Sequence, residues 1–202
     1  MSTNVQTARE DLAFLRGLVD DAPSAGLWYF GAIYVTIGAT ICVHLVLSYL
    51  LEPPLFGIGL VVLYGAASVL FTWIGRRMHG PDAASILGVR SRAAGAVFLS
   101  AIVAHLVMLS VFAILAWRLE TWALIQLAPV VLFVTQGVVW SVLYALGPRT
   151  LTLLQAFGWF FGALVLGALI TTDAFSPVLA AFVVVLMIVP GIHMIRAADK
   201  LR

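Results

Sequence analysis

Six long apolar segments make up most of this chain, and they limit its fold more than any other feature. A helix needs about 20 mostly apolar residues to cross the hydrocarbon core of a bilayer. The segments that meet this length are residues 26–51, 55–75, 93–117, 121–146, 151–171 and 177–195. Because an open sheet edge cannot face lipid, and these runs are too long and uniform for barrel strands, the sequence predicts an all-α polytopic membrane protein.

The composition excludes several classes of function. Apolar residues make up 63% of the chain and charged residues 10%, and the net charge is +2. Soluble domains carry about 45–50% apolar and about 25% charged residues, so this chain could not cover its own surface in water. We therefore exclude a soluble globular enzyme, a disordered protein and a nucleic-acid binder.

Breaks between the apolar segments have local causes. Prolines and glycines interrupt the chain at residues 52–54, 80–82 and 147–149, and Ser176 with Pro177 predicts the N-cap and first position of the last helix. Most loops are short, so consecutive helices are expected to be antiparallel neighbours arranged as three in–out–in hairpins.

Residues 7–22 have a different pattern. Thr7 and Glu10 have the spacing of a capping box, and Leu12, Leu15 and Val19 fall on one helical face. This predicts a short amphipathic helix on the membrane surface or against the bundle, and a docking helix for a partner is the alternative. The predicted organisation is an N-terminal cytoplasmic segment at 1–24, a six-helix transmembrane bundle at 25–196 and a cytoplasmic tail at 197–202.

The distribution of basic residues predicts the orientation in the membrane. With the N-terminus inside, the inner segments hold ten of the eleven Lys and Arg residues, and the outer loops hold only Arg118. The acidic residues Glu52, Glu120 and Asp173 lie one in each outer loop. By the positive-inside rule, both termini should be cytoplasmic.

The middles of the spans carry polar but no acidic or basic side chains, which lowers the expectation of an ion-coupled pump. His44, His105 and His193 lie in spans one, three and six. A transmembrane haem b held by His44 and His105 would need both at one depth, but they are staggered by about 9 Å at 1.5 Å per residue. We therefore expect no cofactor and no metal.

Span one carries a polar ridge in which Thr36, Thr40, His44 and Ser48 are each four residues apart. The hydroxyls either bond back to the backbone and aid helix packing, or form one wall of a polar pathway.

One face of span four carries Gln126, Gln136, Gly137 and Trp140, and this face is expected to point inward because amides in a bilayer need partners. Pro129 on the same face predicts a kink. Inward packing is one interpretation of this stripe. The other is a polar cavity lined by Thr36, Thr40, His44, His105, Gln126, Gln136 and Trp140.

Spans five and six carry packing and bending signals. Gly158 and Gly162 form a small-xxx-small motif with Gln155 on the same face, which predicts a close helix contact within the chain or between protomers. Pro190 with Gly191 predicts a bend near the inner end of span six.

Residues 7–16, Thr-Ala-Arg-Glu-Asp-Leu-Ala-Phe-Leu-Arg, followed by a six-span bundle, resemble a group of uncharacterised bacterial inner-membrane proteins. The resemblance implies the bacterial cytoplasmic membrane and supplies no activity or ligand. The three-hairpin layout is also similar to small stress-linked bacterial membrane proteins.

No catalytic signature is present: the sequence lacks His-Glu-x-x-His, a glycine-rich phosphate loop, Gly-x-Ser-x-Gly and Cys-x-x-Cys. We expect a non-enzymatic regulatory, stress-related or assembly factor whose partners are the lipid bilayer and either a second copy or another membrane or cytoplasmic protein. The alternatives are a small channel or transporter for a neutral or weakly polar solute, and the haem-binding redox protein.

Overall fold

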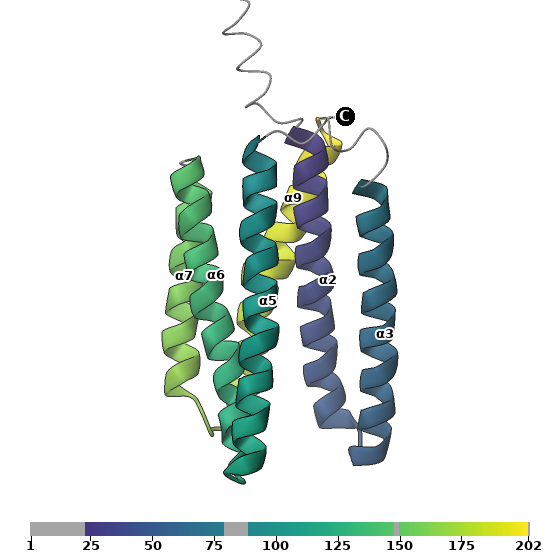
Figure 1. Cartoon of the computed structure of the whole chain (residues 1–202), viewed down its shortest axis with the longest axis vertical. Helices are drawn as coiled ribbons and strands as arrows, with labels where there is room; N and C mark the ends of the chain where they lie inside the picture. Colours follow the sequence, from purple (N-terminus) through teal and green to yellow (C-terminus); the bar gives the residue numbers. More distant parts are fainter. Residues whose placement is uncertain (1–22, 79–88, 148–149, 202) are drawn as a thin grey trace, which may run out of the picture.

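The computed structural model describes residues 23–78, 89–147 and 150–201, and every regular element in these ranges is helical (Figure 1). Six of the helical segments are long and apolar enough to cross a membrane. The predicted all-α class and the number of spanning helices are therefore confirmed. The predicted amphipathic helix at 7–22 lies outside the described residues.

The first three spans are single helices: α2 (Pro23–Leu50), α3 (Pro53–Met78) and α5 (Val89–Arg118). A short 3₁₀ turn, η1 (Trp122–Gln126), then leads into α6 (Leu127–Leu146), which is followed by α7 (Thr150–Ala168). The last span is built from α8 (Phe175–Val183), the π-helical turn η2 (Val184–Ile188) and α9 (Val189–Asp199). The start of α2 and the end of α9 lie at the same end of the bundle (Figure 1).

Two prolines lie in the first turn of their helices instead of kinking them. Pro129 is the third residue of α6, after the 3₁₀ turn, and Pro177 is the third residue of α8. At these positions the backbone N–H would have no partner inside the helix, so proline removes nothing. The predicted kink at Pro129 is thus replaced by a change from 3₁₀ to α geometry. Ser176 was predicted as the N-cap of α8, but Ala174 holds that position.

Two of the predicted hairpin pairs are in contact, α2 with α3 and α5 with α6, whereas α7 makes few contacts with the last span. The most extensive contacts join α6 to α7 and α2 to α9. The last span therefore packs mainly against the first one, although α7 precedes it in the chain. This arrangement makes α2 a central helix, with buried residues on several of its faces, among them Tyr34 and Thr36.

Glycines allow α2 and α9 to lie close together. A Cβ atom added to Gly31 would lie 2.6 Å from the carbonyl oxygen of Gly191, and one added to Gly191 would lie 2.9 Å from that of Gly31. Two turns further along α2, a Cβ atom added to Gly38 would lie 2.8 Å from the Ile188 side chain. Backbones can approach this closely only where no side chain intervenes.

A second pair of glycines joins α6 to α7. A Cβ atom added to Gly137 would lie 2.7 Å from the ring of Phe160, and one added to Gly162 would lie 2.7 Å from the ring of Phe133. Each helix thus offers one glycine to a phenylalanine of the other. The Phe133 ring is fully buried, and it also packs against Trp159 with 4.7 Å between ring centroids.

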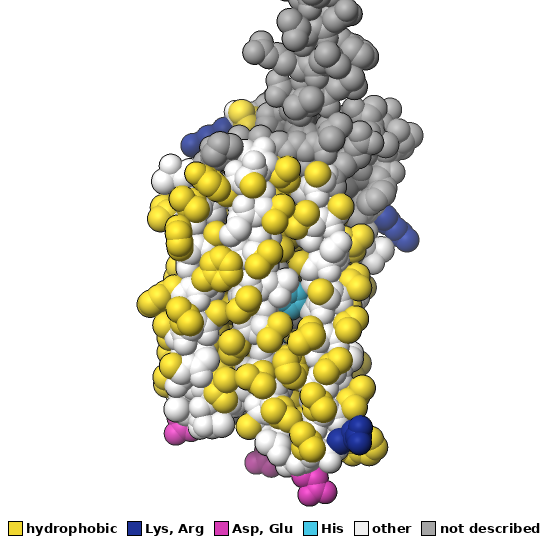
Figure 2. Space-filling view, turned by 60° about the vertical axis from the view of Figure 1, so that its left-hand side comes forward, with side chains coloured by type: hydrophobic (Ala, Val, Ile, Leu, Met, Phe, Trp, Pro, Cys, Tyr) yellow, Lys and Arg dark blue, Asp and Glu magenta, His cyan; other side chains and the backbone are white. Residues whose placement is uncertain are grey.

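Helices α3 and α5 contribute the least to the interior, with the smallest buried share of the six spans. Hydrophobic side chains cover the bundle surface between its two ends, and acidic side chains gather at the lower end (Figure 2). Glu52, Glu120 and Asp173 are all exposed in the turns between helices. An apolar surface of this kind suits contact with lipid tails.

We expect Gly31→Ala to lower the free energy of unfolding by about 1–3 kcal/mol, because the new methyl group meets a backbone atom that cannot turn away. Gly65→Ala is the matched control, since a Cβ at Gly65 meets no atom within 4 Å. Both variants can be compared by denaturant titration in mild detergent micelles. Equal stability of the two would contradict the close contact of α2 and α9.

Candidate functional site

Three polar side chains meet in the centre of the bundle and join α2 to α6. The Tyr34 hydroxyl donates to Oε1 of Gln136 over 2.8 Å, and Nε1 of Trp140 donates to the Tyr34 hydroxyl oxygen over 2.7 Å. Each of these side chains is more than nine-tenths buried. We call Tyr34, Gln136 and Trp140 the central triad.

The direction of these hydrogen bonds follows from the chemistry of the groups. An indole N–H can only donate, so Trp140 must use the Tyr34 oxygen as its acceptor. The tyrosine then offers its own proton, and this proton needs an acceptor on Gln136, which fixes the amide oxygen toward α2. Gln136 and Trp140 are four residues apart on α6, so one tyrosine can reach both.

Aromatic rings surround the central triad. The Tyr34 ring packs edge-on against Trp140 and against Phe98 of α5, with centroids 5.7 Å apart in both pairs. Phe30 continues the cluster, with its centroid 5.0 Å from that of Phe98. These rings keep the three polar groups away from lipid, and they connect α5 to α2 and α6. The apolar surroundings have a low dielectric constant, which strengthens the hydrogen bonds.

The central triad is a neutral chain of donors and acceptors. None of its members is ionised near neutral pH, and its hydroxyl is engaged both as donor and as acceptor. Such a group fixes two helices in register and does not supply an acid, a base or a nucleophile.

The hydroxyls of the predicted ridge on α2 bond to carbonyls of their own helix. The Thr36 hydroxyl donates to the Ala32 carbonyl and the Thr40 hydroxyl to the Thr36 carbonyl, both over 2.8 Å. His44 turns toward α3, where its Nδ1 lies 3.0 Å from the hydroxyl oxygen of Tyr64. The α2 residue that hydrogen-bonds to Gln136 and Trp140 is thus Tyr34, which was not among the predicted site residues.

His105 makes a local contact on α5. Its Nδ1 lies 2.6 Å from the carbonyl oxygen of Ala101, one turn earlier. A carbonyl can only accept, so Nδ1 carries the proton that is donated to it. Nε2 is buried and has no hydrogen-bond partner in the described part of the chain.

Gln126 lies at the end of the bundle and not at its centre. Its Oε1 accepts a hydrogen bond of 2.9 Å from the backbone N–H of Thr171, in the turn between α7 and α8. Thr171 has a φ of 68°, a left-handed conformation that is unfavourable for a β-branched residue. Gln126 therefore fixes the turn at this strained position.

The small residues of α7 lie at helix contacts. Gly162 faces Phe133 of α6, and a Cβ added to Gly158 would lie 2.7 Å from the Leu186 side chain in η2. Gln155, one turn before Gly158 and Trp159, donates from Nε2 to the carbonyl oxygen of Leu186. The indole N–H of Trp159 is fully buried, and none of the described residues accepts a hydrogen bond from it.

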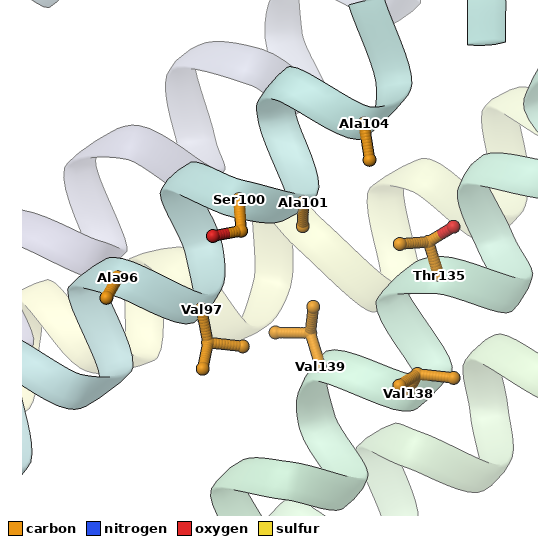
Figure 3. A pocket seen from close by; sticks show the side chains of 8 residues that line it. All are labelled: Ala96, Val97, Ser100, Ala101, Ala104, Thr135, Val138 and Val139. Atoms are coloured by element: carbon orange, nitrogen blue, oxygen red, sulfur yellow. The ribbon is translucent and has the colours of Figure 1, made fainter. Parts of the chain in front are cut away.

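A groove of about 410 Å³ runs between α5 and α6 and is open to the outside (Figure 3). Val97 and Val139 point toward one another across it, and Thr135 donates its hydroxyl to the Val131 carbonyl. The full lining is Ala96, Val97, Ser100, Ala101, Ala104, Thr135, Val138 and Val139. Six of these eight residues are Ala or Val, and none belongs to the polar cavity considered from the sequence.

Metal-ligating side chains are not grouped in the described ranges, where no three His, Cys, Asp or Glu residues lie close enough to hold an ion. Comparison of the chain with protein-family models, with curated proteins and with solved structures finds no match. We therefore infer the role of the candidate site from its geometry alone.

Sequence reasoning missed Tyr34, Tyr64 and Phe98. A tyrosine in the middle of a span is itself a signal, because its hydroxyl needs a partner in hydrocarbon. The partner's identity could not be found from sequence, since Tyr34 and Gln136 are 102 residues apart.

We expect Tyr34→Phe to lower the free energy of unfolding by about 1–3 kcal/mol, because it leaves the Trp140 N–H and the Gln136 oxygen buried without their partner. Tyr49→Phe makes the same chemical change at a side chain that is 67% exposed, and it should have no effect. Thermal unfolding in detergent, followed by tryptophan fluorescence, compares the two. A Tyr34→Phe protein as stable as the control would show that the central triad does not hold the bundle together.

Proposed function

We propose that this chain is a non-enzymatic protein of the bacterial cytoplasmic membrane that acts as an assembly or regulatory factor through contacts between helices. The observation that carries the proposal is the central triad, in which the amide and indole of α6 bind Tyr34 of α2. A solute pathway along α2 and α6 would need these groups to be available to the solute. Their mutual hydrogen bonds favour a structural role.

Helix α3 is the contact helix in this proposal. Gly57, Gly65, Ser68 and Thr72 fall within about 80° of one another around the helix at 100° per residue, and all four are exposed. A Cβ added to either glycine would meet no atom within 4 Å. Ser68 donates to the Tyr64 carbonyl and Thr72 to the Ser68 carbonyl. A second helix can therefore approach this face closely without stranding a hydroxyl.

The proposed orientation places both termini in the cytoplasm. Three observations support it: the split of basic residues in the sequence, the common end of α2 and α9, and the exposed acidic residues Glu52, Glu120 and Asp173 at turns on the opposite end (Figures 1 and 2). The contact face of α3 runs along most of this span, from Gly57 to Thr72.

A photoreactive phenylalanine at Val61, which is 75% exposed on α3, tests the proposal in native membranes. The matched control is the same probe at Leu164, which is equally exposed on α7. We expect a discrete protein adduct from position 61 that is lost when Gly65→Leu is added, and lipid adducts from position 164.

Lipid adducts from both positions would contradict the contact role of α3.

The channel alternative is tested on purified protein in vesicles with neutral solutes of graded size. We expect no flux above that of empty vesicles. A flux that Gln136→Leu abolishes would replace the proposed function with the channel.

A further inference from the structure

The last span is interrupted at a defined point. The apolar run from Phe175 to Asp199 is continuous, but η2 separates α8 from α9 with one π-helical turn. Within it the Val189 N–H donates to the Val184 carbonyl, five residues earlier. A π turn of this kind inserts an extra residue into a helix and commonly marks a functional bulge.

Pro190 comes directly after this turn and leaves carbonyl groups without their normal donors. Proline has no N–H, so residue 190 can donate neither to Leu186, four residues earlier, nor to Val185, five residues earlier. Water is absent from the hydrocarbon core, so a freed carbonyl must find a partner in the protein.

The partner of the Leu186 carbonyl comes from another helix. Nε2 of Gln155 on α7 donates to it, and Gly158 on the same face of α7 makes room for the Leu186 side chain. Helix α7 therefore holds both the backbone and the side chain of this one residue.

Both halves of the span contact α2, and the ring contacts with α6 and α7 come from α8. Gly191 of α9 lies against Gly31 of α2, in the closest backbone approach between these helices. In α8, the ring of Phe182 packs against Phe133 of α6 and Phe161 of α7, at 5.9 Å and 6.2 Å between centroids. Helix α8 and η2 also contact α2, but the contacts with α2 are most extensive along α9, so the π turn lies where the neighbours of the span change.

We propose that η2 is a hinge in the last span and that the Gln155 side chain is the latch that keeps it closed. When the Gln155 amide releases the Leu186 carbonyl, α8 pivots about η2 together with the turn that precedes α8. Helix α9 stays fixed on α2. This device is independent of the proposed function, because it requires no partner and no solute.

The hinge is tested by distance measurement between spin labels on the full chain in vesicles. Labels at Asp173→Cys and Lys200→Cys, with Cys42→Ala, span both halves at roughly 40 Å, given 1.5 Å per residue. We expect one narrow distance distribution in this parent protein and a distribution at least twice as broad after Gln155→Leu. A label pair at Glu52→Cys and Arg76→Cys, along α3, should not change.

A second substitution, Pro190→Ala, distinguishes loss of the Gln155 hydrogen bond from loss of side-chain packing. It restores the N–H for the Leu186 carbonyl, so adding it to Gln155→Leu should return the narrow distribution. Thr135→Val, which removes a side-chain hydrogen bond that stays within α6, should leave the distribution narrow. An unchanged distribution in Gln155→Leu, or failure of Pro190→Ala to reverse the broadening, would overturn the hinge.

If Gln155→Leu alone does not fold, recovery of folded protein by Pro190→Ala supports the latch. Absence of such recovery overturns it as well.

Discussion

Hydrocarbon offers no hydrogen-bond partner, and the fold of this chain depends on how each mid-membrane polar group meets that constraint. Most of these groups meet it in one of two ways, while Nε2 of His105 and the indole N–H of Trp159 have no partner among the described residues. Hydroxyls such as those of Thr36 and Thr40 bond to carbonyls of their own helix, which satisfies the group without fixing any neighbour. The longer side chains of Gln136 and Gln155 bind across to a different helix, and these bonds fix helix positions.

Glycines supply the close contacts that let these cross-helix bonds form. Gly31 and Gly191 bring α2 against α9, and Gly137 and Gly162 receive the phenylalanine rings between α6 and α7. In lipid there is no hydrophobic drive to bring helices together, so van der Waals packing of this kind must supply much of the attraction. The bundle therefore has two closely packed pairs, and the central triad joins them through α2 and α6.

The class and the spans could be predicted from sequence because they depend on apolar runs and local breaks. Six helices follow from the length of those runs, and the bounds differ from the expected ones by a few residues at most ends. The small residues Gly158 and Gly162, and the inward amide Gln136, could also be named, since each has a local signal. Which helices meet could not, because the contacts of α2 with α6 and α9 join residues over a hundred positions apart and no periodicity encodes them.

Prolines illustrate the same limit. Pro129 and Pro190 look alike in sequence, as prolines inside apolar runs, but Pro129 falls in a first helical turn where no N–H is needed. Pro190 is the second residue of α9, but this helix continues directly from the π turn η2, and the Leu186 carbonyl is bound by Gln155 instead of an N–H at residue 190. The two cases differ in the turn that precedes each proline, a 3₁₀ turn before Pro129 and a π turn before Pro190, and the sequence does not show which turn forms.

The central claim is that polar groups in the middle of this bundle bind one another and so hold α2 to α6. A double-mutant cycle with Tyr34→Phe and Gln136→Leu, measured by reversible unfolding in mixed micelles, tests it most directly. The account predicts that the two changes are not additive, with a coupling of about 0.5–2 kcal/mol, as found for hydrogen bonds between membrane helices. Additive losses would contradict it, because the two side chains would then contribute independently of their shared hydrogen bond.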